Sequence, residues 1–219
     1  MSGSARDRPR RDPWARTVPL VLLVALVALT VGVVREGRVY RLDDAVLALT
    51  PGETGGPTLL HALAYLVVDL ATPGLGVAVV VLVAGWLSWR WRDPGPLVVA
   101  VPAIVLLTTT VLVGKAVIDR AAPGFDAVVQ HDGSYPSGHT ATALVCAGVL
   151  AEIVSRLRPH RRRAAWGVAA CWTLLVVIGL LWLHFHWLSD VVGSVLLGSL
   201  VLWLLLRWPW RLGERIARH

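Results

Sequence analysis

The chain has 219 residues, enough for one domain, and 56% of them are hydrophobic. Its mean hydropathy of +0.65 is too high for an ordinary soluble domain and is typical of a protein that crosses a membrane several times. A net charge of +7 would suggest nucleic acid on a soluble protein, but here the arginines lie in blocks between apolar runs. We therefore expect the bilayer, and no nucleic acid, as the partner of this chain.

The first 16 residues are polar and rich in arginine and proline, which predicts a disordered segment. After them come six apolar runs, each long enough to cross a bilayer at about 20 residues, allowing for ragged ends. The runs cover residues 18–34, 75–91, 97–116, 137–155, 164–183 and 189–206. The first run has no convincing small-x-small cleavage site before Arg35, so we interpret it as a span and not as a signal peptide.

A shorter apolar run, Leu59–Leu70, carries His61 and Asp69 and ends at Pro73-Gly74. Its length favours a helix at the membrane interface or packed under the bundle, with a seventh, short span as the alternative. The predicted fold is therefore an all-α polytopic membrane bundle of about six transmembrane helices plus a short interfacial helix. The bundle covers residues 17–207, and residues 208–219 form a basic tail.

The distribution of positive charge predicts the orientation of the bundle. With the N-terminus in the cytoplasm, most of the 21 cationic side chains fall inside. Those left outside are Arg35, Arg38, Arg41, Lys115 and Arg120. We therefore expect a multi-pass plasma-membrane protein with both termini cytoplasmic.

The two cysteines, Cys146 and Cys171, lie inside apolar runs, and their spacing indicates neither a metal site nor a redox site. We expect the chain to need no metal and no other cofactor.

A short turn, Pro136-Ser137-Gly138-His139, stands where a loop enters the fourth apolar run. A helix N-terminus presents unpaired N–H groups and a positive dipole end, so it binds anions. Ser137 would cap the helix or donate its hydroxyl to a phosphate oxygen, and His139 would reach the same anion as an acid. The alternative is a plain N-cap beside an incidental histidine.

Two further elements fall at the same predicted membrane face. His186 and Asp190 are four residues apart, so a carboxylate can fix one ring nitrogen and make the other a better nucleophile. The alternative is a boundary histidine beside a capping aspartate. Lys115, the single lysine of the chain, ends the third run; it would bind an anion or simply snorkel. Arg120 would join that anion site or reach lipid headgroups.

Together, in order and spacing, these residues resemble the three signature motifs of the type 2 phosphatidic acid phosphatase family. That family is the membrane branch of a superfamily shared with vanadium haloperoxidases. Its motifs read Lys, six residues, Arg-Pro; then Pro-Ser-Gly-His; then Ser-Arg, five residues, His, three residues, Asp. The resemblance covers roughly residues 97–206, and six spans with a site on the outer face also match.

The resemblance implies a role for each matching residue. His186 would be the nucleophile that forms a phosphohistidine, Asp190 would orient it, and His139 would protonate the leaving oxygen. Lys115, Ser137 and the backbone N–H of Gly138 would hold the phosphate oxygens.

Two positions depart from the family pattern. Ala122 stands where the first motif has its arginine, and Gly179-Leu180 stands where the third motif has Ser-Arg. Losing one donor of this kind typically costs about 10²–10³ in rate. Arg120, two residues from the first vacancy, would fill it, and His184 would be a poor substitute at the second.

The resemblance thus implies a phosphatase that acts on a lipid phosphate or pyrophosphate at the outer leaflet. The implied substrates are a polyprenyl pyrophosphate, a polyprenyl-phosphate sugar precursor, phosphatidylglycerol phosphate or phosphatidic acid. One alternative is a transferase on the same fold that moves a headgroup or phosphoryl group to another lipid. The other is a non-catalytic, lipid-binding or partner-binding relative.

Overall fold

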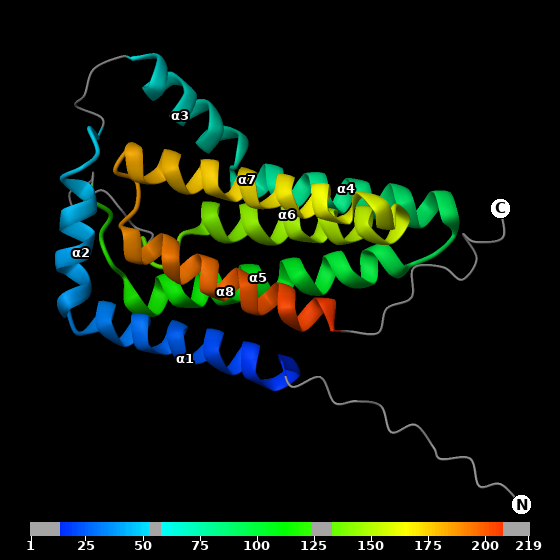
Figure 1. The fold of residues 1–219 in the computed structure, drawn as a ribbon, viewed down its shortest axis with the longest axis horizontal. Coiled ribbons are helices and arrows are strands. Elements are labelled where there is room, and N and C mark those ends of the chain that lie inside the picture. The colour runs from blue at the N-terminus through cyan, green and yellow to red at the C-terminus, as the bar shows by residue number, and fades with distance from the viewer. Residues whose placement is uncertain (1–13, 53–57, 124–132, 208–219) are drawn as a thin grey trace, which may run out of the picture.

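A computed structural model describes residues 14–52, 58–123 and 133–207 (Figure 1). Within these ranges the regular elements are eight α-helices and one 3-10 turn, with no strand, which confirms the all-α prediction. In chain order they are α1 (Trp14–Val34), α2 (Arg38–Leu47), α3 (Leu59–Leu70), α4 (Pro73–Trp91), α5 (Gly95–Ile118), α6 (Gly138–Leu157), η2 (Pro159–Arg161), α7 (Arg162–Trp182) and α8 (Leu188–Leu206).

Six of these helices are long and apolar enough to span a membrane: α1, α4, α5, α6, α7 and α8. Each contains or closely overlaps one predicted apolar run, and the shorter apolar helix α3 has the predicted bounds. Helix α1 begins at Trp14, so residues 14–16 are helical and not disordered as predicted. The remainder of the predicted disordered segment, and the predicted basic tail at 208–219, lie outside the described residues.

Helix α2 is an element that hydropathy did not predict. It has ten residues, begins after Gly37 and mixes charged with apolar side chains, so it gives no transmembrane signal. It runs across one end of the bundle, next to the end of α1 and the connection between α7 and α8 (Figure 1).

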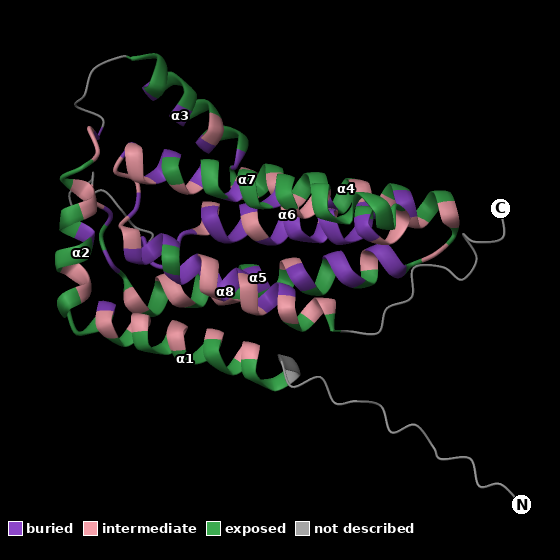
Figure 2. Cartoon of the chain, in the orientation of Figure 1, coloured by how far each residue is buried: buried purple, intermediate pink, exposed green. Residues whose placement is uncertain are grey.

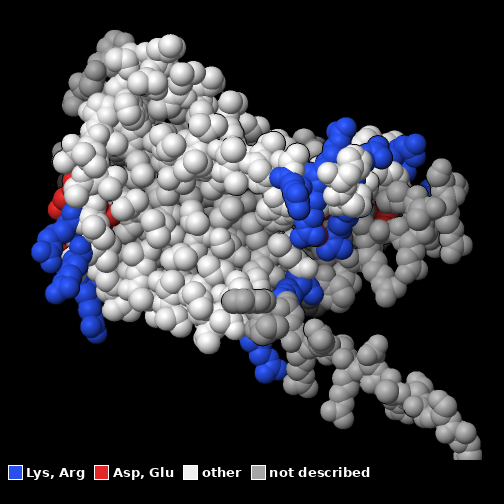
Figure 3. All heavy atoms as spheres, viewed as in Figure 1, with Lys and Arg blue, Asp and Glu red and all other residues white. Residues whose placement is uncertain are grey.

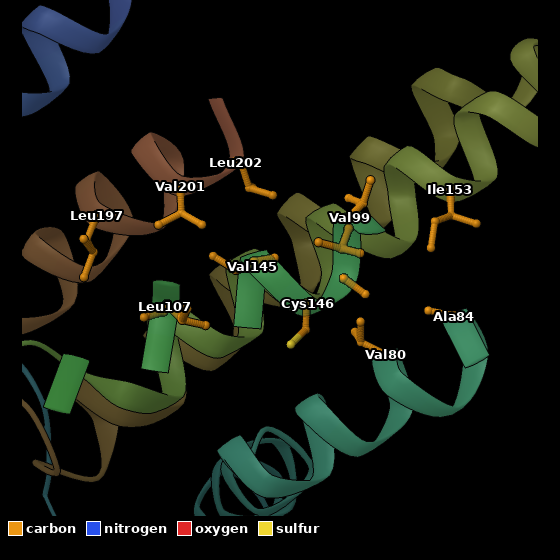
Figure 4. Packing of buried hydrophobic residues seen from close by; sticks show 14 of the residues in the cluster. Val80, Ala84, Val99, Leu107, Val145, Cys146, Ile153, Leu197, Val201 and Leu202 are labelled. Atoms are coloured by element: carbon orange, nitrogen blue, oxygen red, sulfur yellow. The ribbon is translucent and has the colours of Figure 1, made fainter. Parts of the chain in front are cut away.

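Helix α6 is the centre of the bundle. In its most apolar stretch 67% of the residues are buried, whereas only 6% are buried in the corresponding stretch of α1, at the edge of the bundle (Figure 2). Helices α4, α5, α7 and α8 all pack on it. The main core is formed by small and branched side chains such as Val80 of α4, Leu107 of α5, Val145 of α6 and Val201 of α8 (Figure 4).

A second, smaller core holds α3 against α7 and α6. Its buried residues include Val68 of α3, Val176 and Leu180 of α7, and Ala143 of α6. This packing makes α3 part of the bundle at the end where α2 lies.

Charged side chains gather at the two ends of the molecule and leave an uncharged band between them (Figure 3). One end carries α2, the start of α6 and the α7–α8 connection, and the opposite end carries the α4–α5 and α6–α7 connections (Figure 1). This is the arrangement expected of a bundle that crosses a bilayer.

The approach of α8 to the loop before α6 requires a glycine at position 193. A Cβ there would lie 2.6 Å from the hydroxyl oxygen of Tyr135 and 2.8 Å from two atoms of its ring. Because a buried ring cannot yield easily, we expect Gly193→Ala to destabilise the protein by about 1–3 kcal/mol, read as a lower thermal unfolding midpoint in detergent.

Gly167→Ala on α7 is the matched control, since nothing lies within 4 Å of the added Cβ. Both changes gain the same helix propensity, so only the collision separates them. Equal midpoints for the two variants would contradict this account of the packing.

Candidate active site

Three segments far apart in sequence meet at the end of the bundle that carries α2. The backbone N–H of Ser137, before α6, donates to the carbonyl oxygen of Asp190 in α8 at 3.4 Å. Lys115, in the last turn of α5, donates from Nζ to the carbonyl oxygen of Gly133 at 2.6 Å. A Cβ at position 114 would come within 2.6 Å of Pro136, so the glycine lets α5 approach the turn.

The Ser-Gly-His turn begins α6. Ser137 is the N-cap, and its hydroxyl oxygen accepts from the backbone N–H of Thr140 at 3.4 Å, which confirms the predicted cap. Gly138 and His139 are the first two residues of the helix, and N–H groups at these positions have no partner inside a helix. The turn therefore combines free donors with the positive end of the helix dipole.

His186 lies in the connection between α7 and α8, two residues before α8 begins at Leu188. Its Nδ1 is 3.4 Å from Oδ2 of Asp190, so the predicted pairing forms although the histidine is outside the helix. The same Oδ2 accepts from the backbone N–H of Trp187 at 3.1 Å and caps α8. Nε2 of His186 makes no hydrogen bond to any residue that the structure describes.

His139 completes the group. It lies half-buried on the first turn of α6, and the charged or chargeable groups that act on its ring are His186, Lys115 and Asp69. The structure thus brings His139, His186 and Lys115 together at one end of the bundle.

Arg120 lies on the other side of Asp190. Its NH1 donates to Oδ1 of Asp190 at 2.9 Å and to the hydroxyl of Ser189 at 2.6 Å, while NH2 donates to Oδ2 of Asp43 at 2.6 Å. Its guanidinium also lies 4.5 Å from the ring centroid of Tyr40 and 4.9 Å from that of Trp187. The side chain predicted to bind substrate is therefore engaged by two carboxylates of the protein.

The charge on Arg120 is secured by this environment. Burial alone acts to lower the pKa of the guanidinium, but the hydrogen bond to Asp43 and the charge of Asp190 outweigh it and raise the pKa. Arg120 is accordingly a permanent cation, neutralised in place.

Among the residues that the structure describes, no other cation takes the place of either missing motif arginine. Ala122 is buried, and Leu180 is fully buried in the core between α3 and α7. His184 adopts a left-handed backbone at φ 57° and bonds through Nε2 to the hydroxyl and carbonyl oxygens of Thr50, at 2.9 and 3.1 Å. It fixes the chain after α2 and does not replace the second arginine.

Two residues of the site were missed by the sequence analysis. Asp43, on α2, and Ser189, at the start of α8, form a buried network with Arg120. In the sequence, Asp43 stands out only as an acidic residue on a short amphipathic segment before a proline. This signal does not identify Ser189, 146 positions away, as its partner. Within 14–52, 58–123 and 133–207, no group of three or more His, Cys, Asp or Glu side chains is placed to hold a metal ion.

The fold and the site together define a polytopic membrane protein with a histidine pair and a helix N-terminus at one membrane face. A family model for the PAP2 superfamily matches residues 70–214, so the chain belongs to this superfamily. This confirms the resemblance drawn from the three motifs.

Individual relatives agree with this assignment. The chain is 29% identical over 130 residues to phosphatidylglycerophosphatase B of Bacillus subtilis (strain 168), a match that covers 58% of this chain and 63% of that protein. It therefore spans less than two thirds of that relative's length. The fold also matches the crystal structure of a transmembrane PAP2-type phosphatidylglycerolphosphate phosphatase from Bacillus subtilis, with a TM-score of 0.71 and 18% identity, over 90% of this chain and 98% of that one.

The loop before the site carries a buried tyrosine whose ionisation can be measured. Burial raises the pKa of Tyr135 above its usual 10.0, and the charge of Asp190 adds to this, while the hydrogen bond to Thr30 and the charge of Arg120 act in the opposite direction. The folded state therefore favours the neutral phenol. The neutral phenol of Tyr135 contributes fully to the stability of the folded state below pH 10, and this contribution is lost as the pH rises through the raised pKa.

We expect the unfolding midpoint of the wild type to fall more steeply above about pH 10 than that of Tyr135→Phe, which has no hydroxyl to ionise. Thermal unfolding in detergent at a series of pH values measures this. Tyr65→Phe, on the exposed face of α3, should follow the wild type. Parallel curves for the wild type and Tyr135→Phe would contradict the assignment.

Proposed function

We propose that this protein is a membrane lipid phosphatase that works through a phosphohistidine on His186. The observation that carries the proposal is the state of the His186 ring, with Nδ1 toward Asp190 and Nε2 without a hydrogen bond to any described residue. A carboxylate on one nitrogen fixes the tautomer and leaves the other nitrogen with its lone pair available for attack. The free nitrogen lies at the membrane end where α6 begins.

In the proposed reaction, Nε2 of His186 attacks phosphorus and forms an N–P bond as the bond from phosphorus to the lipid oxygen breaks. His139 gives its proton to that oxygen, so the lipid leaves as an alcohol or as a shorter phosphate. A water molecule then gives a proton to His139 and attacks the phosphohistidine. This step releases inorganic phosphate and returns both histidines to their starting states.

The phosphate oxygens would be held by Lys115, the hydroxyl of Ser137 and the N–H groups that begin α6. Lys115 already reaches across to the loop at Gly133, next to this turn. With apolar residues at positions 122 and 180, the helix N-terminus carries a larger part of the charge stabilisation than in the family pattern. Arg120 then serves Asp190 and not the phosphate.

The substrate that we propose is a phosphate monoester on a membrane lipid. The similarity to phosphatidylglycerophosphatase B favours phosphatidylglycerol phosphate, and phosphatidic acid and a polyprenyl pyrophosphate are the comparison substrates. All three place a phosphate at the membrane surface, where the turn and His186 lie.

We also propose that the site faces the outside of the plasma membrane. The cations concentrated at the opposite end of the bundle, including Arg156, Arg158, Arg161, Arg162 and Arg163 around the α6–α7 connection, support a cytoplasmic location for that end.

The decisive activity test is phosphate release in detergent micelles. His186→Ala should lower the turnover of phosphatidylglycerol phosphate by about 10³-fold or more, because the attacking atom is lost. His160→Ala is the matched control, since it removes an exposed histidine at the opposite end of the bundle. Equal release by the wild type and His186→Ala would overturn the proposal.

The orientation can be tested by labelling in whole cells. In a background with Cys146 and Cys171 replaced by alanine, a cysteine is introduced at exposed Arg41 or at exposed Arg158. We expect a membrane-impermeant maleimide to label Arg41→Cys in intact cells and Arg158→Cys only after permeabilisation. The reverse pattern would place the site in the cytoplasm.

A further inference from the structure

Asp43 is a buried carboxylate that belongs to none of the family motifs. It is 1% exposed and comes from α2, outside the part of the chain that the family model matches. Its Oδ1 accepts from the backbone N–H of Ser189 at 2.8 Å. Its Oδ2 accepts from the hydroxyl of Ser189 at 2.7 Å and from NH2 of Arg120 at 2.6 Å.

These contacts run without a gap to His186. Arg120, held by Asp43 at NH2, donates from NH1 to Oδ1 of Asp190, and the other oxygen of Asp190 faces Nδ1 of His186. Ser189 links the same groups, because its hydroxyl donates to Asp43 and accepts from Arg120. The side chains of Asp43, Arg120 and Asp190 are each no more than 5% exposed, so water does not compete for these bonds.

We infer that Asp43 is a positioning residue for the His186–Asp190 pair and acts through Arg120 and Ser189. The inference rests on the proposed function, in which His186 attacks phosphorus. It makes α2 a working part of the site and not only a cover over one end of the bundle.

The physical reason is a competition for Asp190. Arg120 has two counter-ions, and each carries part of the interaction with the guanidinium. Without the charge of Asp43, the buried guanidinium depends on Asp190 alone and draws that carboxylate toward itself. His186 then loses the partner that sets its tautomer and direction. A shift of this kind alters the chemical step more than the binding of the phosphate, because the hydrogen bonds of Asp43 go to Arg120 and Ser189 and not to Lys115 or the N–H groups that begin α6.

Asp43→Asn tests this inference, with Asp44→Asn as the matched control, because Asp44 is the next residue on the same helix and is exposed. We expect Asp43→Asn to lower kcat by about 10- to 100-fold, as a small misplacement of a reacting group does, and to leave KM nearly unchanged. Inhibition by inorganic phosphate should keep its wild-type constant in Asp43→Asn and weaken in Lys115→Ala. Asp44→Asn should match the wild type in all three measurements.

An unchanged kcat in Asp43→Asn would overturn the inference. So would a loss that appears only in KM, since that pattern assigns Asp43 to substrate binding. If Asp43→Asn fails to fold, Ser189→Ala carries the same test, because it removes one link and leaves the Asp43–Arg120 ion pair in place. Wild-type kcat in Ser189→Ala would then overturn the inference.

A second measurement needs no turnover and keeps the two proposals distinguishable. Diethyl pyrocarbonate modifies nucleophilic histidine nitrogens, and mass spectrometry of the peptide gives the rate at His186. We expect this rate to fall several-fold in Asp43→Asn and to stay at the wild-type value in Asp44→Asn. Equal rates in the two variants overturn the role of Asp43, whereas a wild type that releases no phosphate overturns only the proposed function.

Discussion

The buried guanidinium of Arg120 between Asp43 and Asp190 is the interaction on which the site depends. A charge removed from water must be paired and hydrogen-bonded, and removing one partner of a buried pair typically costs about 3–5 kcal/mol. Here one cation at the end of α5 satisfies a carboxylate from α2 and another from α8. The middle of α2, the end of α5 and the start of α8 are therefore held at fixed distances by one group. His186 takes its orientation from this arrangement, because its partner Asp190 is one of the two carboxylates.

The same arrangement limits how the site can hold an anion. A guanidinium that is already neutralised contributes little field at the start of α6, so Lys115 and the helix N-terminus supply most of the positive potential there. At position 180, the leucine that stands in place of the motif arginine contributes to the packing of the bundle. Leu180 packs with Val68 and Val176 in the core that attaches α3 to α7. An arginine at that position would need a counter-ion in this apolar layer, so the packing of α3 and the loss of the second motif arginine belong together.

The sequence was sufficient for the elements whose signal is local. Six apolar runs located the six long helices to within a few residues, because about 20 apolar residues in succession have few other stable arrangements. The cap at Ser137 and the pairing of His186 with Asp190 also follow from short spacings. Helix α2 gave no such signal, and Asp43 meets Ser189 across 146 positions. The spacing around Lys115 placed Arg120 near the site, but which side of Asp190 it would face depended on a helix that was not predicted.

The histidines at this end of the bundle divide by the kind of partner each has. His61 bonds through Nε2 to the carbonyl oxygen of Gly52 at 2.7 Å and through Nδ1 to the hydroxyl of Thr58 at 2.8 Å, so both of its nitrogens are used. His184 is tied to Thr50. These two histidines fasten the chain after α2 to α3 and to the α7–α8 connection. In the part of the chain that the structure describes, His186 combines a carboxylate on Nδ1 with an Nε2 that bonds to no described residue, which is the combination that the proposed nucleophilic attack requires. His61 and His184 thus help to hold α2 in place. In the proposed mechanism, α2 in turn supplies the carboxylate, Asp43, that positions His186.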